Sequence, residues 1–346
     1  MEEERTILWD EQTGCVILVD QTLLPETYKV ISCQNVPSLV DAIQRLAVRG
    51  APALGVAGGY GVALAAHTTH EIPFNRFRKE VHNHADIVRN ARPTAVNLAW
   101  GVDRVLRAMD AAVSVEEARN LALTEAKKIA DEDIASCRQI GEIGAALLPD
   151  RCTVLTHCNA GALACTAWGT ALGIVRTAVQ QGKEVKVIAC ETRPLLQGAR
   201  LTAWELTRDR IDVRVITDSS AAFLMRQGRV DIVLVGADRI TQDAVFNKIG
   251  TYMHAVCARY HTIPFYVAAP VSTFDLIHTE PDICIEERTR EELSFCGDRM
   301  MVPGNAGVLN YAFDATPLSL INGVVTERGI LNPPFSSISR TFGKDT

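Results

Sequence analysis

Five short runs of apolar residues after Pro149 place the strongest constraint on the fold of this chain. They are residues 153–156, 185–189, 213–217, 232–235 and 265–268, and segments with helical character separate them. Unbroken runs rich in valine and isoleucine are typical of strands covered on both faces. Strands that alternate with helices form a parallel sheet wound by right-handed crossovers. The pattern therefore predicts an α/β fold with a Rossmann-like C-terminal domain.

The residues before Pro149 follow a mainly helical pattern instead. Two strand-like segments, 6–8 and 16–18, come first, and helical signals then follow one another. From Ser114 to Leu148 apolar residues recur at helical spacing, and Ser114 with Glu117 forms a capping box at the start. We predict a mainly helical N-terminal domain with short N-terminal strands, residues 1–128, and a Rossmann-like catalytic domain, residues 129–346.

Composition excludes several classes of function. The 35 Lys and Arg against 41 Asp and Glu give a net charge of -6, which disfavours nucleic acid as a partner. The ten cysteines form no CxxC pair and indicate neither a disulfide framework nor a zinc site, so we expect a cytoplasmic protein. Two uncharged runs, 50–66 and 158–175, approach membrane-spanning length. They consist mostly of Gly, Ala and Thr, which favours buried packing and no membrane partner.

Polar residues follow the predicted strands, where ligands bind in folds of this kind. Cys158 comes directly after the first strand, and we expect a helix to begin near Ala162. The dipole and unpaired amides of such a helix would favour a thiolate that acts as a base or a nucleophile. The alternative is a packing cysteine, because cysteine is among the most buried residue types.

Asp238 and the pair Asn247-Lys248 follow the fourth predicted strand. An apolar run precedes Asp238, and a carboxyl group in such surroundings has a raised pKa suited to general acid catalysis. A helix cap or a surface salt bridge is the alternative for Asp238. Lys248 precedes a helical run at 250–260 and suits a phosphate or a sugar hydroxyl, unless it is a solvated loop lysine.

Two arginines in the helical part precede predicted helices. Arg49 stands before Gly50 and Ala51, whose backbone amides can hold an anion at a helix start, while Arg49 supplies positive charge. Arg92 stands beside a proline before an apolar helix in the same way.

Neither a nucleotide cofactor nor a metal is indicated by the remaining motifs. A glycine cluster in the first of these helices follows no strand and matches no dinucleotide fingerprint, so it predicts close helix packing; it comprises Gly55, Gly58, Gly59 and Gly61. His82 and His84 are two residues apart on a predicted helix and face different ways, which favours a surface pair over a metal site.

Eight sequence blocks lie between residues 49 and 314. They are Arg49-Gly-Ala-Pro-Ala53, Arg92-Pro-Thr-Ala95, Thr156-His-Cys-Asn-Ala-Gly161, Glu191-Thr-Arg-Pro194, Gln197-Gly-Ala-Arg200, Gly236-Ala-Asp-Arg-Ile240, Asn247-Lys-Ile-Gly-Thr-Tyr252 and Ala312-Phe-Asp314. Taken together and in this order, these blocks resemble the methylthioribose-1-phosphate isomerase family, which is related to the regulatory subunits of the eukaryotic translation initiation exchange factor.

The resemblance implies a homodimer that needs no cofactor and no metal. It implies that Cys158 and Asp238 are catalytic, and that a further set of residues binds a small sugar phosphate. This set comprises Arg49, Gly50, Ala51, Arg92, Gln197, Asn247 and Lys248.

The implied reaction is the aldose–ketose isomerisation of 5-methylthioribose 1-phosphate to 5-methylthioribulose 1-phosphate in methionine salvage. An isomerase of 5-deoxyribose 1-phosphate is an alternative, since an apolar pocket rejects a substrate that lacks one small group by only ~1–3 kcal/mol. An isomerase of ribose 1,5-bisphosphate is a further alternative, but its second phosphate would require extra basic residues. A noncatalytic regulatory subunit of the same fold is another alternative. The presence of both Cys158 and Asp238 argues against that last alternative.

Overall fold

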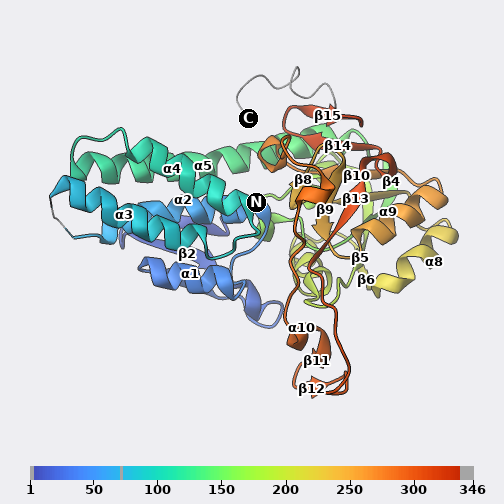
Figure 1. Ribbon diagram of the computed structural model, residues 1–346. Coiled ribbons are helices and arrows are strands. Elements are labelled where there is room, and N and C mark those ends of the chain that lie inside the picture. Colours follow the sequence, from blue (N-terminus) through green and yellow to red (C-terminus); the bar gives the residue numbers. More distant parts are fainter. Residues whose placement is uncertain (1–3, 71–72, 336–346) are drawn as a thin grey trace. The chain divides into compact units, whose positions relative to one another are not determined.

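The structure is a computed structural model that describes residues 4–70 and 73–335 (Figure 1). It divides into two compact units. The first comprises Met1–Gln139 and Ala160–Gly173, and the second comprises Ile140–Asn159 and Ile174–Thr346. The units therefore interleave along the chain, and the boundary between contiguous domains at residues 128 and 129 stays a prediction.

The first unit is built mainly from helices, as predicted. They are α1 (Val36–Gln44), α2 (Ala51–Thr68), α3 (Phe74–Arg89), α4 (Val96–Met109) and α5 (Val115–Ala145), whose last residues belong to the second unit. The predicted N-terminal cap of α5 is present, since the Ser114 hydroxyl accepts a hydrogen bond from the Glu117 N–H at 3.2 Å. The Glu117 carboxylate accepts a hydrogen bond from the Val113 N–H, one residue before the cap, and not from the N–H of Ser114 as in a complete capping box.

The glycines of α2 allow close backbone contact with α4, which confirms their packing role. A Cβ atom on Gly58 would lie 2.4 Å from the Leu98 carbonyl oxygen. A Cβ atom on Gly101 would lie 2.0 Å from the Gly55 carbonyl oxygen. Real Cβ atoms do not approach a carbonyl oxygen so closely, so only glycine fits these contacts. Helix α2 is consequently buried along almost its whole length.

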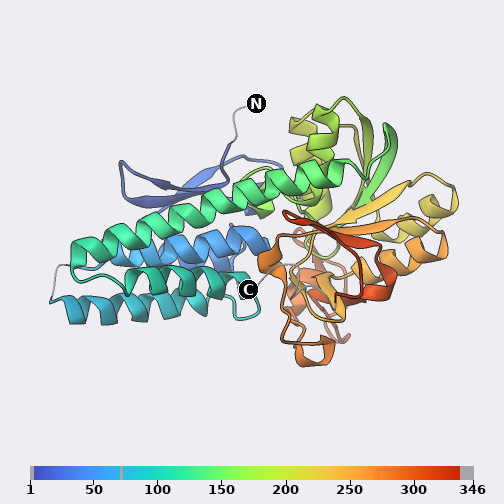
Figure 2. The ribbon, with the colours of Figure 1, turned by 90° about the horizontal axis from the view of Figure 1, so that it is seen from above.

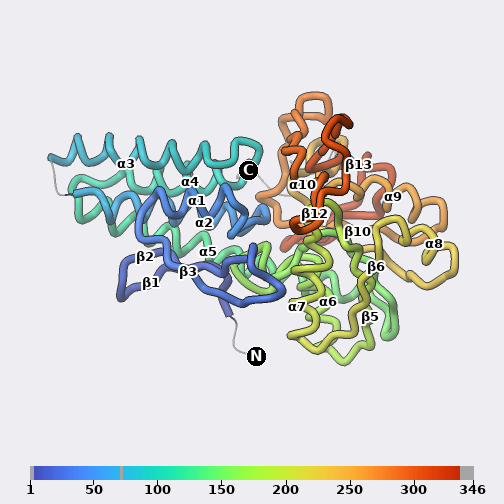
Figure 3. Tube along the Cα trace, turned by 90° about the horizontal axis from the view of Figure 1, so that it is seen from below, coloured from blue at the N-terminus to red at the C-terminus, as the bar shows by residue number. Residues whose placement is uncertain are grey.

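A three-stranded antiparallel sheet accompanies these helices (Figure 3). Its strands are β1 (Ile7–Asp10), β2 (Cys15–Val19) and β3 (Val30–Cys33), in that order. The first two were predicted, but β3 was not. Most of β3 is exposed or half-buried, so it lacks the continuous apolar character that marks the other strands.

The second unit contains a seven-stranded sheet, and all five predicted strands are part of it. These are β4 (Arg151–Thr156), β5 (Glu184–Cys190), β6 (Val213–Ile216), β7 (Ile232–Val235) and β10 (Phe265–Ala268). β14 (Gly323–Thr326) and the antiparallel β15 (Gly329–Leu331) complete it, in the order β15-β14-β10-β7-β4-β5-β6. The six strands from β6 to β14 are parallel and have the order of a Rossmann fold, which confirms the predicted fold class.

Four helices cover this sheet: α6 (Ala171–Gln180), α7 (Ala203–Arg208), α8 (Ala221–Arg226) and α9 (Thr251–Tyr260). In Figures 2 and 3, α6 and α7 lie on the side of strands β5 and β6 opposite to α8 and α9. Apolar residues of α8 and α9 share one core with the central strands. The helix predicted over residues 250–260 is thus confirmed.

The prediction of a helix that begins near Ala162 was wrong. Residues Ala162–Ala164 form only a short 3-10 turn, and the next α-helix, α6, begins at Ala171. Gly161 and Gly169 pair with each other as an isolated bridge, and Gly169 has a φ of +87°. This glycine pair folds the segment into a loop where a helix would otherwise start.

Smaller elements complete the second unit. Strands β8 (Arg239–Ile240), β9 (Ala244–Lys248) and β13 (Phe313–Pro317) form an antiparallel sheet in the order β13-β9-β8. Helix α10 (Arg290–Ser294) and the hairpin β11 (Phe295–Cys296) and β12 (Arg299–Met300) project away from the seven-stranded sheet in Figure 1. Among residues 4–70 and 73–335, no helix combines the length and apolar character that crossing a bilayer requires.

The close approach of α2 and α4 can be tested with Gly101→Ala. Helix propensity alone would make this change stabilising by about 1 kcal/mol. Because the new Cβ would collide with the Gly55 carbonyl, we expect a net loss of about 1–3 kcal/mol and a lower thermal midpoint. Gly307→Ala is the control, since no atom lies within 4 Å of its added Cβ. An unchanged or raised midpoint in Gly101→Ala would contradict the packing argument.

Candidate active site

The two residues predicted to be catalytic follow adjacent strands of the seven-stranded sheet. Cys158 comes just after β4, and Asp238 comes just after β7. These strands pair in parallel, with Val154 beside Ile232. From β4 the chain first adds strands on one side and then, starting with β7, on the other. Ligands bind at such a switch point, outside the carboxyl ends of the strands. The topology therefore marks this end of β4 and β7 as the candidate site.

Cys158 is half-buried, and hydrogen bonds hold its backbone on both sides. Its N–H donates to the Thr192 hydroxyl oxygen at 2.8 Å, and its carbonyl oxygen accepts from the Thr202 hydroxyl at 2.7 Å. The expectation that a helix start activates this cysteine was wrong, because α6 begins only at Ala171. The side chains of Thr192 and Thr202, which both follow β5, fix the position of Cys158 instead of the start of an α-helix.

Asp238 connects the main sheet with the small sheet of β8 and β9. It is half-buried, and its N–H donates to the Phe246 carbonyl oxygen at 2.9 Å. The antiparallel register pairs Arg239 with Phe246, so Asp238 lies directly before β8 and bonds to the residue that precedes Asn247 on β9. The structure therefore brings the predicted acid next to the strand that carries the predicted amide ligand.

Asn247 and Lys248 are both buried, although a solvated loop was the alternative for the lysine. The Asn247 amide donates to the Thr251 hydroxyl at 3.1 Å. The Lys248 ammonium donates to the Ala312 carbonyl at 2.8 Å and lies 4.6 Å from the centre of the Phe313 ring. These contacts hold a positive charge at the end of β9, where it can attract an anion.

Gln197 presents an unsatisfied acceptor in the same unit. It follows β5 and is 6% exposed, and its Oε1 atom has no hydrogen-bond partner among the described residues. A buried acceptor without a partner costs about 1–3 kcal/mol. A ligand hydroxyl that donates to this oxygen would remove that cost.

The other four predicted ligands belong to the first unit. Arg49 is buried, and its Nε atom donates to Gln21 at 3.0 Å. Gly50 caps α2 with a φ of +99°, and Ala51 is the first residue of that helix, as expected. Arg92 is half-buried shortly before α4 begins at Val96. Each of these residues therefore lies beside a helix start, whose exposed amides favour anions.

A buried histidine pair lies beside the cysteine loop. His157 Nε2 is 2.8 Å from the Ile249 carbonyl oxygen, and His157 Nδ1 is 3.2 Å from His254 Nε2. Burial lowers the pKa of His157 to about 4 and the pKa of His254 to about 3. Both rings are therefore neutral at physiological pH. His254 could not be identified from the sequence, because a single histidine inside a helix gives no local signal.

Within residues 4–70 and 73–335, two clusters have side chains of metal-binding type, but their bonding favours other roles. His157, Cys190, Asp218 and His254 have ligand atoms within 4.8 Å of one another. Asp218 already accepts the Thr192 and Arg193 N–H groups, and burial raises the pKa of the Cys190 thiol. A protonated thiol is a poor metal ligand. In the first unit, Asp133 of the cluster with Cys137 and Cys165 likewise accepts the Thr166 N–H at 2.6 Å.

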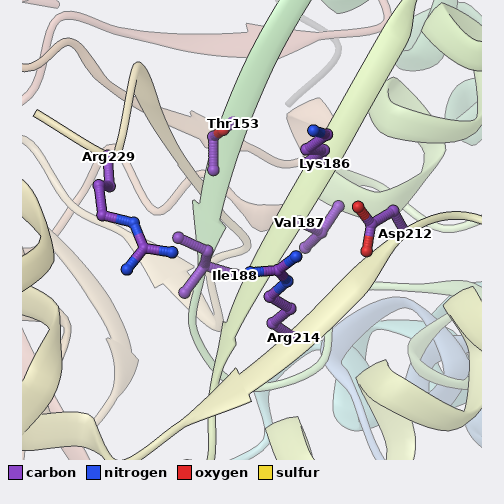
Figure 4. Close-up of a pocket in the computed structure, with 7 residues that line it drawn as sticks. All are labelled: Thr153, Lys186, Val187, Ile188, Asp212, Arg214 and Arg229. Atoms are coloured by element: carbon purple, nitrogen blue, oxygen red, sulfur yellow. The ribbon is translucent and has the colours of Figure 1, made fainter.

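A pocket of about 230 Å³ in the second unit is lined by none of the predicted site residues (Figure 4). Its lining comprises Thr153, Lys186, Val187, Ile188, Asp212, Arg214 and Arg229. Several of these residues belong to β4, β5 and β6, whereas Cys158 and Asp238 lie beyond strand ends. The switch-point rule therefore favours the Cys158 and Asp238 position as the reactive site over this pocket.

Comparison with known proteins gives consistent results. A model described as the initiation factor 2 subunit family matches residues 47–333. A putative methylthioribose-1-phosphate isomerase from Methanosarcina acetivorans is 55% identical over 331 residues, which is 96% of this chain and 95% of the relative. The crystal structure of 5-methylthioribose 1-phosphate isomerase from Pyrococcus horikoshii has a TM-score of 0.91 and 41% identity, with 99% and 96% of the two chains covered.

A second solved structure has a different description. The crystal structure of translation initiation factor eIF-2B, subunit delta, from A. fulgidus has a TM-score of 0.87 and 54% identity. The match covers 97% of this chain and 98% of that chain. Relatives with both descriptions thus share the whole fold described above.

The neutral histidine pair predicts a pH dependence of stability. In the unfolded chain His157 and His254 have the ordinary histidine pKa of 6.5. In the folded protein the pKa is about 4 for His157 and about 3 for His254. Stability from this pair is therefore complete above pH 6.5 and is lost as the pH falls towards 4. For each histidine the loss is about 1.4 kcal/mol per pH unit within its window. We expect the thermal midpoint of the wild type to fall more steeply with acid than that of His254→Gln.

Other titratable groups contribute equally to the pH dependence of the wild type and of His254→Gln. The difference between the two thermal midpoints therefore reports the titration of the histidine pair. Asp218 and Lys248 act on the pair electrostatically in both proteins. His70→Gln is the control, because His70 is exposed. Equal slopes for the wild type and His254→Gln between pH 7 and 5 would show that His254 is charged or accessible in the folded state.

Proposed function

The chain belongs to the initiation factor 2 subunit family, and we propose that within it the protein acts as a methylthioribose-1-phosphate isomerase. The observation that carries this proposal is the placement of Cys158 and Asp238 just after the two strands that flank the switch point. Similarity to isomerases over almost the full chain supports it. The reaction converts 5-methylthioribose 1-phosphate to 5-methylthioribulose 1-phosphate in methionine salvage.

The first chemical step is opening of the sugar ring. The phosphate on the anomeric oxygen blocks the spontaneous opening that free aldoses use. In our proposal Asp238 protonates the ring oxygen as the bond between that oxygen and carbon 1 breaks. The half-buried position of Asp238, beside the buried Asn247 strand, supports this role because hydrogen bonds are stronger away from water.

Two routes are open for the hydrogen transfer that follows. In one, the Cys158 thiolate takes the proton from carbon 2 and returns it to carbon 1, while the hydroxyl on carbon 2 gives its proton to the Asp238 carboxylate and becomes the ketone. In the other, the hydrogen moves directly from carbon 2 to carbon 1 as a hydride, and Cys158 only stabilises the transition state. Solvent deuterium at carbon 1 of the product would identify the first route, and full retention of a carbon 2 label would identify the second.

Substrate binding is proposed for the remaining predicted residues. Lys248, Arg49 and Arg92 would bind the phosphate and hydroxyl groups by charge-assisted hydrogen bonds. The amides of Gly50 and Ala51 would support an anion at the start of α2. Gln197 and Asn247 would bind hydroxyl groups, and the unsatisfied Gln197 Oε1 supports this role. The proposal includes no cofactor and no metal.

A noncatalytic regulatory subunit is the second candidate function. The A. fulgidus structure described as an initiation factor subunit, at 54% identity, favours it. An isomerase of 5-deoxyribose 1-phosphate or ribose 1,5-bisphosphate is a variant of the main proposal. The assay below distinguishes these possibilities.

A homodimer in the cytoplasm is also part of the proposal. The dimer rests on the family resemblance, and light scattering coupled to gel filtration would measure it directly. All ten cysteines are free thiols, which suits a reducing compartment.

Turnover by the purified protein is the central test. We expect the highest kcat/KM on 5-methylthioribose 1-phosphate, with lower values on 5-deoxyribose 1-phosphate and ribose 1,5-bisphosphate. Cys158→Ala and Asp238→Asn should each reduce kcat by about 10²–10⁴-fold, the usual contribution of a general acid or base. Arg214→Ala, in the pocket of Figure 4, should leave kcat unchanged. Absence of turnover on every sugar phosphate would favour the regulatory subunit.

Gln197 should contribute to binding at the expense of stability. Gln197→Met keeps the size of the side chain and removes the buried acceptor that has no partner. We expect the thermal midpoint to stay equal or rise, because up to about 1–3 kcal/mol of unfavourable burial is removed. At the same time KM should rise. A marked loss of stability in Gln197→Met would show that the amide serves the fold instead of the substrate.

A further inference from the structure

Two residues in the loops after β4 and β5 adopt a backbone conformation that L-residues rarely use. Cys158 has a φ of +64°, and Thr192 has a φ of +67°. The left-handed region is an outlier for a β-branched residue such as threonine. Each such residue costs about 1–3 kcal/mol and persists only where its surroundings enforce it. The two strained residues are also bonded to each other, because the Cys158 N–H donates to Thr192 Oγ1.

The Thr192 side of this contact is fixed by its own hydrogen bonds. The Thr192 hydroxyl donates to the Cys190 carbonyl oxygen at 3.0 Å, so its lone pairs face the Cys158 N–H. The Asp218 carboxylate accepts the N–H groups of Thr192 and Arg193, each at 2.8 Å. Thr192 is completely buried. Its hydroxyl therefore has one orientation, set by β5 and by the loop after β6.

A second threonine fixes the other side of Cys158. The Thr202 hydroxyl donates to the Cys158 carbonyl oxygen at 2.7 Å, and it accepts from the Asn159 amide at 3.2 Å. The Asn159 amide also donates to Glu205, whose carboxylate is paired with Arg176 at 2.8 Å. Thr202 is completely buried and ends a π-helical turn, Gly198–Thr202. Such turns occur frequently at functional sites.

From this geometry we infer that Thr192 and Thr202 are positioning residues for the Cys158 thiol. Their hydroxyls hold the backbone of Cys158 in its left-handed conformation and so set the direction of its side chain. This inference rests on the proposed isomerase function for its kinetic consequence. A displacement of about 1 Å in a reacting group can reduce a rate 10²-fold, so a clamp on both peptide groups of the cysteine has catalytic value.

A purely structural role would give a different pattern. Each hydroxyl could satisfy a backbone group in any loop, yet here both act on one residue that bears a proposed reacting group. If a hydroxyl serves only the fold, its removal lowers the fraction of folded enzyme. The reactivity of the remaining folded molecules then stays unchanged. Loss of positioning changes the reactivity of Cys158 itself. The reactivity of this single thiol is therefore the decisive readout.

The test uses Thr192→Val and Thr202→Val in the full chain. Valine matches threonine in size and branching, so only the hydroxyl is lost. We expect kcat on 5-methylthioribose 1-phosphate to fall about tenfold or more in each, with KM nearly unchanged, because binding residues are not altered. The alkylation rate of Cys158 by iodoacetamide, followed by mass spectrometry of its peptide over a range of pH, should change in the same variants.

Conservative and matched variants complete the design. Thr192→Ser and Thr202→Ser retain the hydroxyl, so kcat and the alkylation profile should return close to wild type. Thr273→Val is the control, because the buried Thr273 hydroxyl in the same unit has no hydrogen-bond partner among the described residues. If Thr192→Val does not fold, Thr202→Val decides the question from the other side of Cys158.

The outcomes separate this inference from the proposed function. If the wild type turns over its substrate but both valine variants keep kcat and the Cys158 alkylation profile, the positioning role is wrong and the isomerase stands. If the wild type turns over no sugar phosphate while the alkylation profile still changes in the valine variants, Thr192 and Thr202 do position Cys158, and the proposed isomerase function is wrong. If the serine variants behave like the valine variants, the hydroxyls do not hold Cys158.

Discussion

The parallel pairing of β4 with β7 is the contact on which the rest of the second unit depends. Successive strands are added outward from this pair in opposite directions, which gives the order β6-β5-β4-β7-β10-β14. The loops after β4 and β7 must therefore diverge, and their polar residues are not covered by a crossover between them. A cysteine on one loop and an aspartate on the other are thus brought to one end of the sheet by chain topology alone.

Much of this arrangement could be predicted because it depends on local patterns. The five apolar runs correctly predicted five strands of the seven-stranded sheet, and Ser114 and Gly50 marked helix starts correctly. The prediction of a helix near Ala162 failed because the pairing of Gly161 with Gly169 folds this segment into a loop and overrides its helix propensity. Strand β3 was not predicted because it is largely exposed, and its sequence therefore contains no continuous apolar run.

The candidate site was only partly predictable for a similar reason. Cys158 and Asp238 could be found because each directly follows a strand, and the resemblance supplied roles for the binding residues. Thr192, Thr202 and His254 could not be found, since their importance lies in contacts across 34 to 97 positions of sequence. No local pattern distinguishes a threonine that bonds to a cysteine backbone from one that only fills space.

The charged pocket of Figure 4 has a consequence for the behaviour of the protein in concentrated solution. Strand β6 is an edge of the seven-stranded sheet, and edge strands invite pairing with strands of other molecules. Arg214 on β6 and Lys186 on β5 are exposed beside this edge, and Arg229 adds a third positive charge. Desolvating these cations opposes the docking of another strand, so the edge resists aggregation without a covering helix.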